Sequence, residues 1–195
     1  MSKANKSNKA IKYRLYPNDE QKVMFAKTFG CCRFVYNQLL ALQKQRYKDG
    51  ESHLSKLKSN EFATRTLKKD YDFLKEIDKF AVSNAVFHLA DAYDRFFKKQ
   101  NHFPKFKSKR KSKKSYTTNF TNNNILIGKN VIKLPKVGMV KAVIHKLPKD
   151  DWKLKSVTVS QDSVGNYFAS VLFEYEQEDI PSVSKSSTNS IGLDY

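Results

Sequence analysis

The stretch AIKYRLYPNDE, residues 10–20, combines the two patterns that decide the fold. Apolar and polar residues alternate along its first part, with Ile11, Tyr13 and Leu15 on one face. This alternation is typical of a strand with one buried face. A proline ends the strand, and Asn18 can cap a helix because its side chain accepts hydrogen bonds from free backbone N–H groups. The chain is therefore expected to pass directly from a strand into a helix.

Helical periodicity follows the strand and continues to about residue 100. The first helical region, 19–48, contains Gly30, which predicts a bend or a close packing point. Two weaker helical segments and a strong one are expected after it, at 54–69, 71–77 and 79–100. In the strong helix apolar residues recur every three or four positions, which we interpret as core packing. That apolar stripe consists of Val82, Val86, Leu89, Tyr93, Phe96 and Phe97.

From Ser115 onward the period of the sequence changes to two. Hairpin turns are predicted at 128–130 and 162–166, between runs of alternating residues. Several short strands joined by turns indicate a small antiparallel barrel or sandwich. The expected fold class is α+β, with a small antiparallel, OB-like β barrel interrupted by a helical bundle.

The change of pattern divides the chain into five expected parts. They are a β-barrel domain from residues 10–17 and 115–178, a helical domain at 18–102 with a helix-turn-helix-like start at 18–50, a basic connector at 103–114, a Ser-rich linker at 179–189, and a strand start at 190–195.

Charge narrows the possible partners. Lys and Arg total 37 against 19 acidic residues, a formal net charge of +18. Such an excess costs folding stability through self-repulsion and is typical of proteins that bind polyanions. Nucleic acid is the leading candidate partner, and an anionic membrane surface is the second. The basic stretch lacks the apolar face of a membrane-surface helix, so we expect no membrane partner.

The expected compartment is the cytoplasm of a bacterium or archaeon, in association with the nucleoid. No run approaches the roughly 18 apolar residues of a spanning helix, and the Lys-rich start lacks the apolar segment of a signal peptide. The only cysteines, Cys31 and Cys32, are adjacent, and adjacent cysteines rarely satisfy disulfide geometry. We interpret them as a buried or half-buried pair on a helix, which fits a reducing compartment.

The densest positive charge lies at 105–114, KFKSKRKSKK, with seven basic residues and no acidic one. Lys and Arg can neutralise phosphates and release counterions, and neighbouring aromatic residues can stack on bases. The alternative is a solvated, mobile loop without a partner. We favour binding because the run joins two folded parts and the strands beyond it are also basic. The candidate nucleic-acid-binding residues are Lys12, Arg14, Arg33, Lys105, Lys107, Lys109, Arg110, Lys111, Lys113, Lys114, Tyr116 and Lys141.

Catalytic motifs are scarce. There is no glycine-rich phosphate loop, nucleophile elbow or kinase-like set of motifs. The four histidines have no ligand spacing, so we predict no histidine-bound metal. The ending IGLD (191–194) places Asp194 after an apolar segment, a position in which metal-dependent nucleases hold divalent cations. The alternative is an ordinary Asp on a terminal strand.

Six blocks in fixed order resemble the TnpB, or OrfB, proteins of insertion sequences, often called transposases. They are RLYPNDEQ (14–21), FGCCRFVYN (29–37), FPKFKSKR (103–110), LPKVGMVKAVIH (134–145), VTVSQDSVGNYFASV (157–171) and SIGLDY (190–195). The resemblance implies an RNA-guided DNA endonuclease related to the type V CRISPR effectors. It also implies a wedge barrel interrupted by a helical recognition domain and followed by a RuvC-like (RNase H-like) nuclease domain.

The resemblance further implies partners and cofactors. The wedge and recognition parts are expected to bind a guide RNA from the element's end, and double-stranded and displaced single-stranded DNA. Asp194 matches the first carboxylate of the nuclease triad, with Mg²⁺ and a structural Zn²⁺ implied for the whole family protein. Because the other triad residues are not in this sequence, we expect a truncated protein that needs no cofactor and does not cleave DNA alone.

Two alternatives stay open. The chain could be one half of a split active endonuclease, with the remaining carboxylates on another polypeptide. It could instead be a generic basic RNA- or DNA-binding module, in which case the strand at 11–16 should not pair with strands after residue 115. The sequence leaves the oligomeric state, the identity of the RNA and the target-flanking motif open.

Overall fold

The passage from strand to helix predicted for residues 10–20 is confirmed. In a computed structural model that describes residues 5–177, β1 (Asn5–Tyr16) leads into α1 (Asp19–Lys48). The Asn18 side chain accepts a hydrogen bond from the Gln21 backbone N–H at 2.8 Å, and the Gln21 side chain accepts one from the Asn18 N–H at 3.1 Å. This reciprocal cap fixes where α1 begins.

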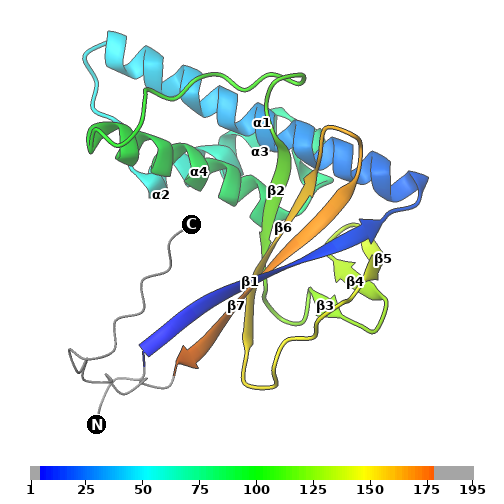
Figure 1. Ribbon diagram of the computed structural model, residues 1–195. Coiled ribbons are helices and arrows are strands. Elements are labelled where there is room, and N and C mark those ends of the chain that lie inside the picture. Colours follow the sequence, from blue (N-terminus) through cyan, green and yellow to red (C-terminus); the bar gives the residue numbers. More distant parts are fainter. Residues whose placement is uncertain (1–4, 178–195) are drawn as a thin grey trace, which may run out of the picture.

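Seven antiparallel strands form one sheet, in the order β2-β6-β7-β1-β5-β4-β3 (Figure 1). The turns predicted at 128–130 and 162–166 join β3 to β4 and β6 to β7. In the second turn Gly165 has a φ of +92°, which a residue without Cβ adopts at little cost. The strands beyond β1 are β2 (Lys114–Asn119), β3 (Leu126–Ile127), β4 (Val131–Leu134), β5 (Gly138–Val143), β6 (Lys153–Gln161) and β7 (Tyr167–Gln177).

Strand β1 is central to the sheet. It pairs with β7 over the whole stretch from Asn5 to Leu15, and with β5 from Arg14 to Tyr16. A segment near the N-terminus is therefore enclosed by strands that come more than a hundred residues later. This pairing contradicts the topology expected of a generic binding module with an independent first strand.

The predicted closed barrel is wrong, because the sheet is open. Its edges are β2 and the two-residue strand β3, which do not pair with each other. A barrel has to close its last strand onto its first, and β3 offers too few backbone groups for that. Helices α1 and α4 contact β2 and cover the apolar side of the sheet, so its core is buried without closure (Figure 1).

The expected helical segments between β1 and β2 are present. They are α2 (Lys56–Glu61), the π-helical segment η1 (Phe62–Leu67), α3 (Lys68–Asp70), the 3₁₀ turn η2 (Asp72–Lys75) and α4 (Lys79–Phe97). Helix α1 continues without interruption through Gly30, and no heavy atom lies within 4 Å of the position a Cβ would take there. The close packing point predicted at this glycine is therefore wrong.

Sheet and helices share one hydrophobic core. Tyr13 and Leu15 of β1 are fully buried in it, which confirms the alternation predicted for that strand. Phe25 and Phe29 of α1 contact the ring of Tyr116 on β2, with centroids 6.3 and 5.9 Å apart. The buried Asp78 caps α4 and also accepts a 2.7 Å hydrogen bond from Thr118 of β2. Helix α4 is thus attached to the edge of the sheet by a polar contact as well as by packing.

The two cysteines are buried, free thiols of α1, as predicted. Burial raises the pKa of Cys31 to about 11 and that of Cys32 to about 12. The Cys32 thiol also donates a 3.4 Å hydrogen bond to the Ala81 carbonyl of α4. Both thiols are therefore held in the protonated form, which is a poor nucleophile.

We predict that neither thiol reacts with a thiol reagent until the protein unfolds. In the unfolded chain the thiols ionise near their ordinary pKa of 9.0, whereas in the folded protein they stay protonated. The unfolded state then binds fewer protons, so the free energy of unfolding should fall as the pH rises from 9 toward the folded pKa values. Denaturation curves at a series of alkaline pH values measure this. Serine at both positions should reduce the fall, and an unchanged fall would exclude the thiols as its cause.

Candidate nucleic-acid interface

The basic connector, residues 103–114, is packed against α1 for the first half of its length (Figure 1). The Asn37 side chain donates to the Lys107 carbonyl at 2.9 Å and accepts from the Lys107 N–H at 2.8 Å. The Lys107 ammonium lies 3.9 Å from the centroid of the Tyr36 ring, and Pro104 is buried. These contacts fix the backbone, so this half is not the mobile loop that was the alternative to a binding segment.

The second half of the connector turns sharply before β2. The Ser112 hydroxyl accepts from the Ser108 N–H at 2.9 Å, and the Ser108 hydroxyl accepts from the Lys111 N–H at 3.1 Å. Within residues 5–177 no basic residue of the connector forms a salt bridge with a carboxylate. Their charge is therefore available to an external anion. Lys109, Arg110, Lys111 and Lys113 are exposed around this turn, and Lys114, also exposed, donates to the Gln161 side chain.

A basic cavity of about 420 Å³ lies between α1, α4 and the end of the connector. It is lined by four of the predicted residues, namely Arg33, Lys107, Lys113 and Lys114. His88 of α4, for which the sequence predicted no binding role, also lines it. A pocket with this many donors and no lining carboxylate fits a phosphate group.

Electrostatics in the basic cavity favour an anion. Burial lowers the pKa of Lys107. Desolvation, followed by repulsion from Lys107, lowers the pKa of His88. Desolvation thus disfavours the charged form of both groups, and the Asp91 carboxylate offsets this only in part at His88. A bound phosphate would favour the charged form and raise both pKa values.

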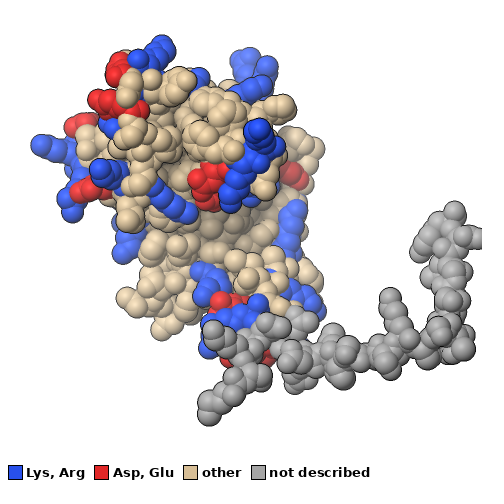
Figure 2. Space-filling view, turned by 90° about the vertical axis from the view of Figure 1, so that its left-hand side faces the viewer, with Lys and Arg blue, Asp and Glu red and all other residues tan. Residues whose placement is uncertain are grey.

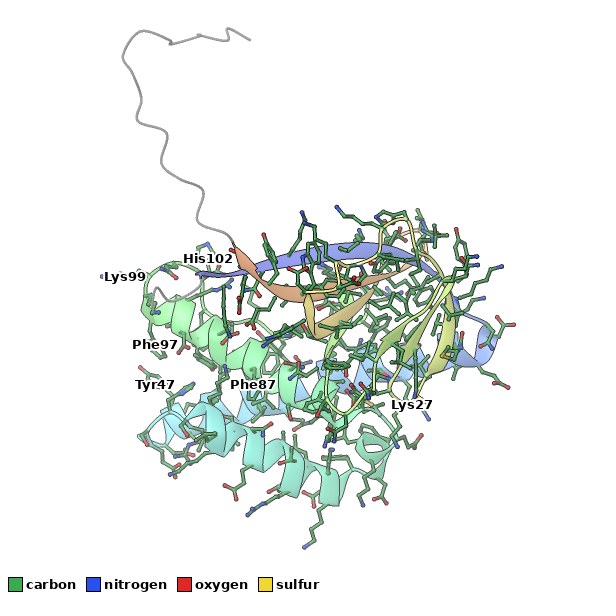
Figure 3. All side chains as sticks on the ribbon, turned by 90° about the horizontal axis from the view of Figure 1, so that it is seen from below. Lys27, Tyr47, Phe87, Phe97, Lys99 and His102 are labelled. Atoms are coloured by element: carbon green, nitrogen blue, oxygen red, sulfur yellow. The ribbon has the colours of Figure 1, made fainter. Side chains whose placement is uncertain are left out.

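A second cationic group lies on the outer face of the sheet, opposite the helices. In Figure 3 the helices lie on one side of β1 and β7. On the other side the Phe168 ring has the Lys12 ammonium 4.2 Å from its centroid and the Arg14 guanidinium carbon 5.0 Å away. Arg14 also donates to the Asn166 side chain in the β6–β7 turn. An aromatic ring between two cations offers a base both a stacking surface and neighbouring charge.

Hydroxyl groups extend this outer face toward β2. The strand register places Arg14 beside Phe168, Phe168 beside Ser160, and Ser160 beside Ser115. The next row on the same face runs from Lys12 through Ser170 and Thr158 to Thr117, and the last two share a 2.8 Å hydrogen bond. Small hydroxyl side chains leave the backbone of a bound strand room to approach and can donate to its phosphates.

The predicted residues therefore fall into distinct places. Arg33, Lys107, Lys113 and Lys114 line the basic cavity, while Lys12 and Arg14 lie on the outer face of the sheet. Lys141 of β5 is exposed and pairs with Tyr16, on the same face. Lys105 is exposed on the packed half of the connector. Asp194 lies outside the described residues.

Tyr116 is not part of either group. Its ring is only 3% exposed and packs between the sheet and α1. The base-stacking role predicted for it is therefore corrected to a core role. Phe168, which was not among the predicted binding residues, presents the aromatic surface instead. Its alternation with the buried Tyr167 and Ala169 was the signal that could have identified it.

Within residues 5–177 no group of three or more His, Cys, Asp or Glu side chains is placed to hold a metal ion. The Mg²⁺ and Zn²⁺ implied by the resemblance thus find no fitting ligand set there, and their sites stay predictions for residues beyond this range. None of the helices in the same range has the length and apolar character required to cross a membrane.

Comparisons with known proteins relate the chain to proteins of insertion sequences. Residues 5–52 match a family described as a helix-turn-helix domain, found in OrfB proteins of insertion sequences. In this structure the matched segment consists of β1, the single helix α1 and the loop after it. A protein of Streptomyces pristinaespiralis, provisionally named an RNA-guided DNA endonuclease, is 30% identical over 188 residues. A protein of Escherichia coli, InsQ, carries the same provisional name and is 29% identical over 192 residues.

These two alignments each cover 95% of this chain, but only 45% and 44% of the relatives. The chain thus spans less than half the length of these proteins. A third relative, the virulence protein VsdF of Salmonella dublin, is 32% identical over 111 residues, which cover 52% of this chain and 93% of that protein.

The fold and the matched domain define an α+β protein whose first strand and first helix match the helix-turn-helix domain of OrfB proteins. The chain is a homologue of the N-terminal part of the TnpB/OrfB-type proteins of insertion sequences that are provisionally named RNA-guided DNA endonucleases.

Proposed function

We propose that residues 5–177 bind a structured guide RNA from the end of an insertion sequence, together with the DNA target. The observation that carries this proposal is the convergence on one cavity of Arg33 from α1 with Lys107 and Lys113 from the distant connector. The helix, the connector and the sheet all contribute unpaired cations, so an RNA with closely spaced phosphates fits better than a small anion.

The outer face of the sheet supports binding of a second strand. Its cations flank an aromatic ring, and rows of hydroxyl side chains continue from them across β7, β6 and β2. We assign binding to these residues, and cleavage to the carboxylate set of which Asp194 is the candidate member in this sequence. In that assignment residues 5–177 are the nucleic-acid-binding part of an RNA-guided nuclease. The Mg²⁺-dependent cleavage of DNA belongs to the nuclease domain.

The proposal is tested by measuring affinity as a function of salt. The chain is titrated into a labelled RNA from the element's end and into an unrelated hairpin of equal length. We expect the affinity for the first RNA to be higher and to fall steeply as salt rises, because each neutralised phosphate releases counterions. Equal affinity for the two RNAs, or an affinity that salt does not change, would contradict the proposal.

A further inference from the structure

An aromatic cavity of about 710 Å³ lies at the end of the molecule where α1 and α4 both finish. Its volume falls within the roughly 300–1,000 Å³ of ordinary ligand pockets. It is distinct from the basic cavity, with which it shares no lining residue. Its aromatic lining consists of Tyr47, His53, Tyr93, Phe96, Phe97 and Phe103.

The cavity has a fixed floor and exposed walls. Tyr93 at the floor is buried and contacts His53, with ring centroids 4.6 Å apart, and Phe103, with centroids 5.6 Å apart. The loop carrying His53 is held by Gln43 of α1, whose side chain exchanges two hydrogen bonds with the Leu54 backbone, at 3.2 and 3.0 Å. The pocket is thus built before any ligand arrives.

The walls expose more aromatic surface than folding requires. Tyr47 is 84% exposed and Phe97 is 64% exposed. Phe97 continues the apolar stripe of α4 beyond the core, so its ring has no packing role equal to that of Val82 or Leu89. In Figure 3 both side chains lie at the same end of the molecule, near Lys99. An exposed cluster of large apolar side chains indicates an interaction site.

The charge around the cavity indicates the occupant. The Lys44 ammonium lies 5.5 Å from the Phe103 ring centroid and 4.9 Å from that of Phe106, and Lys48 also lines the pocket. The one lining carboxylate, Glu51, is paired with Arg46. Figure 2 shows this end of the molecule, with Lys and Arg side chains, and Asp and Glu side chains among them, at the margins of an uncharged area. Aromatic faces bordered by free cations suit a base and its phosphates better than an apolar protein surface.

We propose that this aromatic cavity takes up one unstacked base of a single-stranded polynucleotide, with its flanking phosphates on Lys44 and Lys48. The proposal rests on the proposed function, since it presumes that the chain binds nucleic acid. The connector joins the two cavities, because it runs from Phe103 at the aromatic cavity to Lys107 at the basic cavity. A strand following the connector would meet both sites.

The test compares single-stranded oligo(dT) with an abasic strand of the same length, which keeps the phosphates but lacks bases. We expect the protein to bind oligo(dT) about tenfold more tightly, since stacking on aromatic side chains contributes at this level per base. Phe97→Ala and Tyr47→Ala should each remove most of that advantage and leave the affinity for the abasic strand unchanged. Phe97→Trp should retain it. Phe120→Ala, which truncates an exposed aromatic residue outside the cavity, is the matched control.

The outcomes separate this proposal from the proposed function. Binding of both strands with equal affinity, or an advantage for bases that survives Phe97→Ala and Tyr47→Ala, would overturn the base site and leave the phosphate-binding function intact. Failure to bind either strand, with the element-end RNA still bound, would overturn the base site alone, whereas failure to bind that RNA as well would overturn both. If Phe97→Ala instead dissociates a dimer, measured by light scattering, the cavity is a contact between two copies of the chain and the base site is wrong.

Discussion

Neutralising four exposed cations of the connector should weaken binding of the element-end RNA by about a thousandfold at about 150 mM salt. The four substitutions are Lys109→Gln, Arg110→Gln, Lys111→Gln and Lys113→Gln. Each cation that binds a phosphate contributes roughly 0.9 to the slope of log affinity against log salt on a duplex, so removal of four such cations should reduce that slope by about 3 to 4. The slope and the affinity are measured in the same titration.

Lys107 is left unchanged in this variant because it is structural as well as basic. Its backbone is clamped by Asn37, and its ammonium lies over the Tyr36 ring. A change there would alter the path of the connector, and weaker binding could not then be assigned to charge. The four chosen residues are exposed and have no carboxylate partner among the described residues, so their neutralisation should leave the free energy of unfolding nearly unchanged.

A matched control removes the same amount of charge elsewhere. The control substitutions are Lys58→Gln, Lys69→Gln, Lys129→Gln and Lys149→Gln, at exposed positions dispersed over the molecule. Both variants lower the net charge of +18 by four. If net charge alone attracted the RNA, the two variants would weaken binding equally and the connector would not be the site. A much larger effect of the connector variant would locate the phosphates on it.

Local signals predicted much of this fold. The alternation of Ile11, Tyr13 and Leu15 identifies the buried face of β1, because neighbouring side chains on a strand point to opposite sides. The turns at 128–130 and 162–166 contain Gly and Asn, which favour hairpins whatever the rest of the chain does. The stripe of α4 is likewise a property of a single helix. These predictions depended on residues close together in the sequence.

Closure of the sheet depends on distant residues, and there the prediction failed. Whether β2 meets β3 is decided by the helices that cover the sheet and by the length of β3, neither of which a strand pattern reveals. The effect of Gly30 on the helix also depends on distant residues, because packing decides whether a helix continues through a glycine. A glycine inside a helix costs about 1 kcal/mol relative to alanine, which is too little to interrupt α1 when buried residues from Phe25 to Gln43 pack on both sides of it.

The sequence predicted the basic residues of the candidate site, but it did not predict the cavity that they line. The run at 105–114 is visible in the sequence, but the cavity exists only because Asn37 holds the connector against α1. His88 could not be identified as a lining residue from the sequence, because it lines the cavity only when the connector packs against α1. Tyr116 was assigned to the surface because it follows the basic run. Its orientation is set by pairing with Val159 of β6, which turns its ring into the core.

Tyr13→Ala should be strongly destabilising, with a loss of about 3–5 kcal/mol in the free energy of unfolding. The side chain is 0% exposed, and its hydroxyl donates a 2.7 Å hydrogen bond to the Lys146 carbonyl. Since β1 lies between β7 and β5, a cavity at Tyr13 weakens the junction between the two halves of the sheet. For a protein with about 5–15 kcal/mol of total stability, this loss is a large fraction. Chemical denaturation followed by circular dichroism measures it.

Two further variants separate the contributions of the hydroxyl group and of the buried ring to the loss of stability in Tyr13→Ala. Tyr13→Phe keeps the ring but leaves the Lys146 carbonyl without its donor, so we expect a loss of about 1 kcal/mol. Tyr16→Ala, on the same strand but 51% exposed, should cost less than about 1 kcal/mol. Lys12 and Arg14 lie on the opposite face of β1 from Tyr13, so the position of the outer binding face depends on this buried ring. If Tyr13→Ala proved as stable as Tyr16→Ala, β1 would not be the strand that joins the two halves of the sheet.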